Sequence, residues 1–219
     1  MSYEHDDSRR QALKSVAAIG VAVTLPAAVL APCQVQAAGI AAPALSAPFL
    51  SVTERGILEA IVARLIPSDA QSPGAKEARA AEYIDRALGG ALAGARKAYS
   101  AGLAALDAYA LASKGAAFVA LSADDQDALL SGLEKNSATG FTPNAAAFFN
   151  LLLGHTLQGT FCDPAYGGNA GFVGWDLIGY PGLRMAVAPE EQRMGVKVKP
   201  YRQSAYADSN LPKGGGHGH

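Results

Sequence analysis

Three side chains close together in the sequence are of the types used in nucleophilic catalysis. Cys162 could act as a nucleophile, His155 as its base and Asp163 as the group that orients the histidine. On an unbroken helix, the seven-residue step from His155 to Cys162 places their side chains roughly 10 Å apart, too far for a hydrogen bond. The spacing therefore favours structural roles. We expect a buried His155 hydrogen-bonded to loop backbone, and an Asp163 that caps or turns the chain before Pro164.

Residues 155–182, here called the recognition segment, have a composition suited to binding another protein. This stretch combines seven glycines with the only tryptophan of the chain and four other aromatic residues after His155. Glycine permits positive φ and close backbone approach, and aromatic side chains supply large anchors for protein interfaces. The predicted partner-contact residues are Phe161, Asp163, Tyr166, Gly167, Gly168, Asn169, Trp175 and Tyr180.

Two alternatives stay open for this segment. The run from Tyr166 to Asn169 also has the composition of a purely local turn, because Gly and Asn accept left-handed backbone geometry. Tyr166 and Trp175 could point outward to a partner or inward to lock the segment on its own domain.

Neither the composition nor the motifs of the chain favour binding to nucleic acid, a cofactor or a metal ion. The chain has 219 residues and a net charge of −1, so nothing favours binding to nucleic acid. Its two cysteines form no C-x-x-C pair, and no G-x-G-x-x-G, P-loop or H-E-x-x-H motif occurs. The terminal His217 and His219 lack a third ligand. We therefore assign no catalytic, cofactor-binding or metal-binding residue to this chain.

Residues 1–38 have the order of an export signal, in which a basic stretch precedes an apolar one and small residues follow. The residues that match the twin-arginine motif are Ser8, Arg9, Arg10, Leu13 and Lys14. The alternative is a membrane anchor, but the apolar run is about 17 residues long and contains Pro26, at the short limit for spanning a bilayer. Twin-arginine export carries folded proteins, which usually hold a cofactor or travel with a partner that does. A chain without a cofactor motif is thus expected to travel with a partner.

The elements that position these residues are predicted to be helices. Residues 39–50 form a Pro/Ala linker, residues 51–182 a helical domain, and residues 183–219 an extended or disordered tail that could lie over a partner. Caps and breakers predict five helices: from the Ser51–Glu54 capping box to Pro67, over residues 75–88, over 92–113, from Ser122 to Lys135, and from Thr142-Pro143 to Asp163.

The last of these helices is apolar nearly all round, so we expect it to be the buried central helix. No alternating strand pattern of useful length occurs. The predicted fold class is therefore mainly α: a bundle of about five helices followed by an irregular segment rich in glycine and aromatic residues.

The chain resembles the gluconate 2-dehydrogenase subunit 3 family over roughly residues 50–182. The residues that carry the resemblance are His155-Thr156-Leu157-Gln158-Gly159, Phe161-x-Asp163-Pro164-x-Tyr166-Gly167-Gly168-Asn169, Gly174-Trp175-x-Leu177-Ile178-Gly179-Tyr180-Pro181-Gly182, the helix from Leu58 to Asp69, Tyr83-Ile84-Asp85, Tyr99-x-x-Gly102-Leu103-x-x-Leu106-Asp107 and Leu121-Ser122-x-x-Asp125-Gln126.

The resemblance implies a non-catalytic accessory subunit of a periplasmic complex, associated with the membrane through that complex. In this family the partner is a large flavoprotein of the glucose–methanol–choline type, which holds FAD and the substrate, and a multihaem cytochrome c often forms a third subunit. Two alternatives are a stand-alone hydrolase or thiol enzyme using Cys162 and His155, and a periplasmic module that binds a small ligand.

Overall fold

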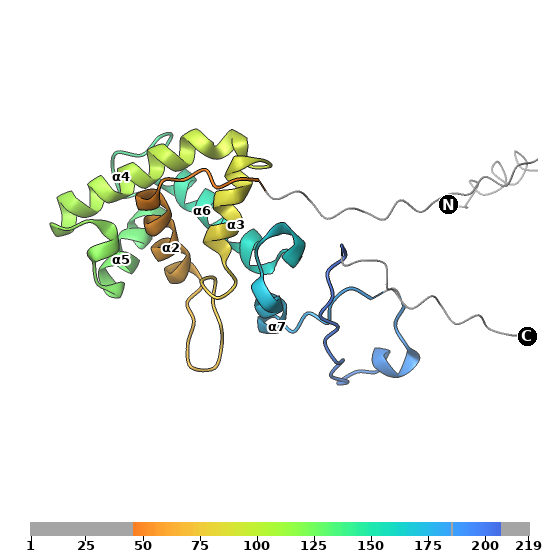
Figure 1. Cartoon of the computed structure of the whole chain (residues 1–219). Helices are drawn as coiled ribbons and strands as arrows, with labels where there is room; N and C mark the ends of the chain where they lie inside the picture. Colours follow the sequence, from red (N-terminus) through yellow and green to blue (C-terminus); the bar gives the residue numbers. More distant parts are fainter. Residues whose placement is uncertain (1–45, 185, 207–219) are drawn as a thin grey trace, which may run out of the picture. The chain divides into compact units, whose positions relative to one another are not determined.

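The computed structural model describes residues 46–184 and 186–206, all within the second of two units, residues 38–219 (Figure 1). The predicted export signal, most of the linker and the terminal His217 and His219 lie outside the described residues. No helix in the described ranges is both long and apolar enough to cross a membrane.

The described chain is helical and contains no strand, which confirms the predicted mainly-α class. Its α-helices are α2 (Val52–Leu65), α3 (Ala80–Gly89), α4 (Arg96–Lys114), α5 (Ala123–Glu134), α6 (Ala145–Phe161) and α7 (Val173–Leu177). Short 3₁₀ turns lie at Ala93–Ala95, Phe118–Ala120, Pro164–Tyr166, Ala170–Phe172 and Pro189–Gln192.

Two predicted helix starts are confirmed by their caps. Ser51 and Glu54 form a reciprocal capping box at the start of α2, and the Ser122 hydroxyl accepts a hydrogen bond from the Asp125 backbone N–H at the start of α5. Each cap satisfies a backbone donor that the first helical turn leaves unpaired. These two boundaries follow from local sequence alone.

The other three helix starts were predicted wrongly. The helix expected over residues 92–113 begins at Arg96, because Ala93–Ala95 forms a 3₁₀ turn. The fifth helix begins at Ala145 and not at Pro143, because Asn144 is the cap and its side chain accepts a hydrogen bond from the Ala147 N–H at 2.8 Å. The second begins at Ala80 rather than at residue 75. Residues 74–79 form turns, and Arg79 has a left-handed φ of 58° that excludes helix at that position.

The helix α6 packs against α2, α3, α4 and α5, as expected of a central helix. Its Phe148 ring occupies the space that a Cβ at Gly102 of α4 would need, so these two helices approach closely there. Burial is not complete around α6, however. Leu157, near its end, is 43% exposed, which its apolar neighbours in the sequence did not predict.

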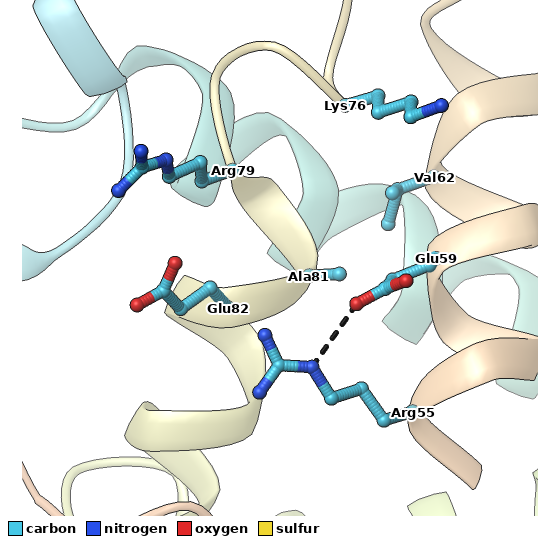
Figure 2. Close-up of a pocket in the computed structure, with 7 residues that line it drawn as sticks. All are labelled: Arg55, Glu59, Val62, Lys76, Arg79, Ala81 and Glu82. Carbon is cyan, nitrogen blue, oxygen red and sulfur yellow. Dashed lines mark hydrogen bonds and ion pairs between the residues drawn. The ribbon is translucent and has the colours of Figure 1, made fainter. Parts of the chain in front are cut away.

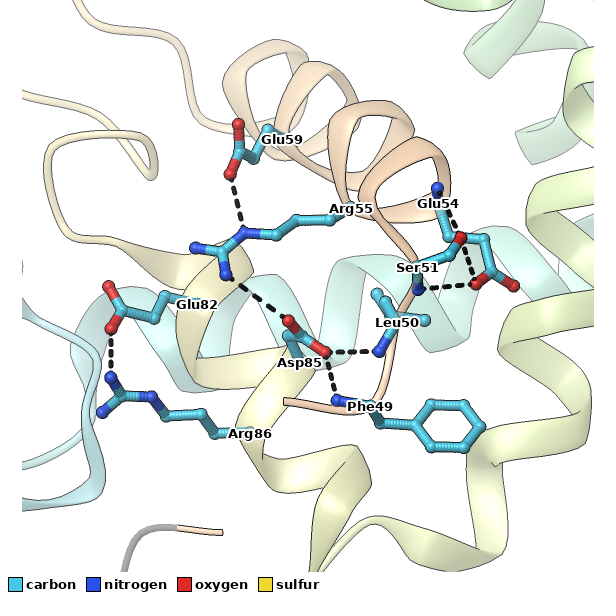
Figure 3. Close-up of polar contacts among 9 residues, drawn as sticks. All are labelled: Phe49, Leu50, Ser51, Glu54, Arg55, Glu59, Glu82, Asp85 and Arg86. Atoms are coloured by element: carbon cyan, nitrogen blue, oxygen red, sulfur yellow. Dashed lines mark hydrogen bonds and ion pairs between the residues drawn. The ribbon is translucent and has the colours of Figure 1, made fainter. Parts of the chain in front are cut away.

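The end of the predicted linker is docked on the bundle by a buried carboxylate (Figure 3). The Asp85 Oδ1 atom accepts hydrogen bonds from the backbone N–H groups of Phe49 and Leu50 at 2.8 and 2.7 Å. The Arg55 guanidinium lies 3.6 Å from the other carboxylate oxygen. A buried charge is tolerated when it is paired and hydrogen-bonded in this way, so Asp85 ties the chain before α2 to α3.

Candidate functional site

The recognition segment beyond α6 is held against that helix in part by a buried residue, Asn169. The Asn169 N–H donates to the Gly159 carbonyl, its Nδ2 donates to the Cys162 carbonyl, and its Oδ1 accepts from the Gly174 N–H, each at 2.8 Å. The residue is fully buried and has a φ of 44°. Sequence reasoning expected turn chemistry at Asn169 but did not predict that it links α6 to α7.

Two glycines allow this fastening. A Cβ at Gly168 would overlap the carbonyl oxygen of Gly159, and a Cβ at Gly174 would overlap that of Thr160. The backbone of the segment therefore lies directly against the last turns of α6, as close approach through glycine permits. Gly167 contributes differently, since it ends the turn at Pro164–Tyr166 with a φ of 89°.

Trp175 is buried within the domain and does not face the solvent. It is 8% exposed, and its Nε1 donates to the Phe161 carbonyl at 3.0 Å. The Phe172 and Tyr180 rings lie against it, with centroids 5.1 and 4.9 Å away. Of the two orientations left open for this residue, the structure has the inward one, so Trp175 locks the segment in place.

Tyr166 has the opposite orientation and is 40% exposed. It stands at the edge of an open, mainly apolar groove on the surface, here called the outer groove. The lining residues are Tyr83, Leu157, Gln158, Phe161, Cys162 and Tyr166. Two predicted contact residues, Phe161 and Tyr166, thus lie together on one exposed surface, whereas Asn169 and Trp175 are buried beneath it.

The thiol of Cys162 is poorly placed for catalysis. Burial raises the pKa of Cys162 to about 11, and its Sγ lies 3.8 Å from the Gly159 carbonyl oxygen. Because the thiolate and not the thiol is the nucleophile, this residue is almost entirely unreactive at neutral pH.

His155 is buried as predicted, but its partner was predicted wrongly. Its Nδ1 lies 3.0 Å from the hydroxyl of Tyr99 on α4, and the two rings stack with centroids 5.7 Å apart. Burial lowers the pKa of His155 and raises that of Tyr99. The hydrogen-bond partner of His155 is thus the Tyr99 side chain on another helix, and not the loop backbone that was expected.

Asp163 serves as the predicted turn cap, since its Oδ1 accepts a hydrogen bond from the Ala165 N–H at 2.9 Å. Its other described contacts lie in the tail, at Ser204 and Ala205. His155 bonds to Tyr99, and the Cys162 thiol is held neutral. The geometry therefore does not favour the thiol-enzyme alternative.

A separate pocket lies between α2 and α3 (Figure 2). Its charged lining residues are Arg55, Glu59, Lys76, Arg79 and Glu82. Arg55 is paired with Glu59 at 3.0 Å, and Glu82 with Arg86 at 2.6 Å. Cations and carboxylates alternate around the pocket, so it presents no concentrated charge of one sign. No pattern in the sequence predicted this pocket.

Within residues 46–184 and 186–206, no group of three or more His, Cys, Asp or Glu side chains could hold a metal ion. The terminal histidines lie outside these ranges, so the absence of a metal site stays a prediction for the whole chain.

A comparison with family models matches residues 53–182 to the family described as gluconate 2-dehydrogenase subunit 3. The match covers more than half of the 219 residues and includes the bundle and the recognition segment to its last glycine. Neither the comparison with curated proteins nor the comparison with solved structures returned a match. The family match is sufficient for assignment: the chain belongs to the gluconate 2-dehydrogenase subunit 3 family.

Proposed function

We propose that the chain is a non-catalytic small subunit that binds and stabilises the FAD-bearing large subunit of a gluconate 2-dehydrogenase-like complex. The family description names a subunit of a dehydrogenase, which supports a role inside a complex. The observation that carries the proposal is the outer groove. It lies on the recognition segment within the matched residues, and it exposes Leu157 and Tyr166 above a frame fixed by Asn169.

The outer groove has properties suited to docking. Apolar side chains that stay exposed in the lone chain gain free energy when a partner covers them, at roughly 25 cal/mol per Å² of apolar surface. The frame beneath them is already ordered by Asn169 and Trp175. Binding to a pre-ordered surface avoids much of the entropy cost of ordering a loop.

The proposal places the redox chemistry outside this chain. The large subunit, a flavoprotein of the glucose–methanol–choline type, holds FAD and the substrate, and a multihaem cytochrome c is a candidate third subunit. The small subunit keeps the flavoprotein folded. Its twin-arginine motif carries the folded pair to the periplasm, where the complex associates with the membrane.

Docking is tested by co-expressing the full chain with a flavoprotein of the glucose–methanol–choline type from the same organism and measuring the dissociation constant of the pair. Leu157→Asp should weaken the complex at least about tenfold, or 1.4 kcal/mol, because a charge would be buried in the interface. Leu111→Asp is the matched control, since Leu111 is also exposed on a helix but lies on α4 away from the groove.

Thermal unfolding of each variant separates lost docking from lost folding, and Leu157→Gln is the milder replacement if Leu157→Asp unfolds. The proposal fails if the wild-type chain does not associate with the flavoprotein. The assignment of the groove fails if both aspartate variants bind like the wild type.

Export is tested separately by replacing Arg9 and Arg10 with lysine. We expect the flavoprotein to remain in the cytoplasm, because the paired arginines are the distinctive part of the motif. Immunoblots of periplasmic and cytoplasmic fractions measure this. Undiminished flavoprotein in the periplasm would contradict the escort role and leave docking untouched.

A further inference from the structure

The tail contains a stretch whose apolar side chains are not buried. None of the residues 186–206 is buried. Met194 is fully exposed, and Val187 and Val196 are each close to half exposed. Residues 183–200 are called the arm below.

Hydrogen bonds close the base of the arm. The Tyr201 N–H donates to the Pro181 carbonyl at 2.8 Å, and the Arg184 guanidinium donates to the Lys199 carbonyl at 2.9 Å. Gly182 has a φ of 87°, and a Cβ there would overlap the Tyr201 carbonyl oxygen. The arm therefore starts and ends at the same place, directly after the recognition segment.

Residues 201–206, here called the clasp, bind back onto the recognition segment. Arg202 pairs with both carboxylate oxygens of Asp176, at 2.6 and 3.2 Å. Asp163 accepts hydrogen bonds from the Ser204 hydroxyl at 2.6 Å and the Ala205 N–H at 2.7 Å. A further clasp contact joins the hydroxyls of Tyr166 and Tyr206 at 2.6 Å.

The energetics of the arm differ from those of the clasp. Ordering a residue costs about 1–2 kcal/mol in backbone entropy, and the arm buries no described side chain that would offset this cost. A partly exposed ion pair at the surface, such as Arg184–Glu191, contributes roughly 0–1 kcal/mol. The apolar groups of the arm can contribute only when another surface covers them.

We propose that the arm is a second contact with the flavoprotein subunit, an inference that rests on the proposed function. It would fit a partner surface with an apolar patch for Met194 and Val196, bordered by acidic groups that face Lys197 and Lys199. The charge of the arm supports this chemistry, because four of its six charged residues are basic.

The position of the arm beside the outer groove also supports the flavoprotein as its partner. Tyr166 lines the outer groove and also bonds to Tyr206 of the clasp, so the clasp holds the end of the arm beside the groove. A flavoprotein seated on the groove is thus within reach of the arm. The arm lies outside the matched residues 53–182, so this contact extends the interface beyond the family's common domain.

The test compares Met194→Asp with the wild type in the co-expressed, full-length pair. We expect the dissociation constant to rise at least about tenfold, with no change in the melting temperature of the lone subunit, because Met194 touches nothing that could be destabilised. Val52→Asp is the matched control: Val52 is 91% exposed, but it lies on α2. A Lys197→Glu, Lys199→Glu double variant should also weaken the complex. Because repulsion would then replace attraction to the acidic groups of the partner, added salt should weaken the variant complex less than the wild-type complex.

The outcomes separate this inference from the proposed function. If the wild-type pair forms and Met194→Asp binds equally well, the arm proposal is overturned and the subunit role stands. If the wild-type pair does not form, both the arm contact and the proposed subunit role are wrong. If Met194→Asp alters only self-association of the lone chain, the arm contacts a second copy and the proposal is also overturned.

Discussion

Two neighbouring irregular stretches of this protein, residues 163–180 and the arm, are held in opposite ways. The first places Asn169 and Trp175 inside the domain, where hydrogen bonds tie them to α6. The second buries no described side chain and is anchored only at its base. Composition already distinguishes them, because the first has four aromatic and two charged residues, whereas the arm has six charged residues and no aromatic one.

The difference shows what converts an irregular stretch into a rigid one. Buried polar groups must be satisfied, and a side chain that satisfies several at once fixes the backbone around it. Asn169 does so, whereas the hydrogen bonds from Arg202 of the clasp to Asp176 are exposed to water. We therefore expect mutations in the first stretch to affect stability and those in the second to affect binding.

The largest expected effect is that of Trp175→Ala. Removing a buried tryptophan should cost about 3–5 kcal/mol of unfolding free energy, because it leaves a cavity and an unpaired Phe161 carbonyl. Urea unfolding followed by far-ultraviolet circular dichroism measures this without the tryptophan signal. Met194→Ala, at a fully exposed position, should change stability by less than about 0.5 kcal/mol. Equal losses in both variants would remove the contrast between the two stretches.

Asn169→Ala is expected to come next, with a loss of about 2–4 kcal/mol. The change removes two side-chain hydrogen bonds and leaves the Gly174 N–H and the Cys162 carbonyl without them in a buried place. Asn169→Asp keeps an oxygen that can accept from the Gly174 N–H, but it loses the N–H group that donates to the Cys162 carbonyl. It would also place a negative charge in a buried position. It should therefore not recover the wild-type stability. An alanine variant as stable as the wild type would show that Asn169 does not hold the segment.

A smaller effect is expected from pH through His155. Burial lowers its folded-state pKa below the ordinary 6.5, so the unfolded chain takes up the proton first as pH falls. Burial of the neutral His155 side chain therefore contributes less to the free energy of unfolding as pH drops below about 6.5. The loss is at most about 1.4 kcal/mol per pH unit. His155→Gln should flatten this part of the curve. An unchanged acid slope in that variant would assign the effect to other groups.

The smallest stability effect is expected for the clasp. Arg202→Ala should cost less than about 1 kcal/mol, because the Arg202–Asp176 pair is exposed. Limited proteolysis should nevertheless cut the tail faster in this variant, since the clasp opens more often. If the variant lost as much stability as Asn169→Ala, the tail would be part of the folded core.

Local sequence predicted those features that depend on nearby residues. The Ser51–Glu54 and Ser122 caps, the mainly-α class and the burial of His155 follow from short-range patterns, and the structure has them. The start of α6 was placed wrongly because Thr142-Pro143 and Asn144 are both plausible caps, and the hydrogen bond to Ala147 selects Asn144.

Features that depend on distant residues were not predictable. The partner of His155 comes from α4, the two donors to Asp85 come from the end of the linker, and the exposure of Leu157 depends on where neighbouring helices end. The glycines and aromatics of the recognition segment indicated its location. Which of them face inward depends on tertiary packing that one sequence does not specify.

Hydrogen exchange, measured by mass spectrometry on the lone chain and on its complex with the flavoprotein, tests the central claim most directly. We expect residues 163–180 to exchange slowly in both samples, and residues 186–200 to exchange rapidly alone and at least about tenfold more slowly in the complex. Rapid exchange throughout 163–180 in the lone chain, or an arm unaffected by the bound flavoprotein, would contradict the account.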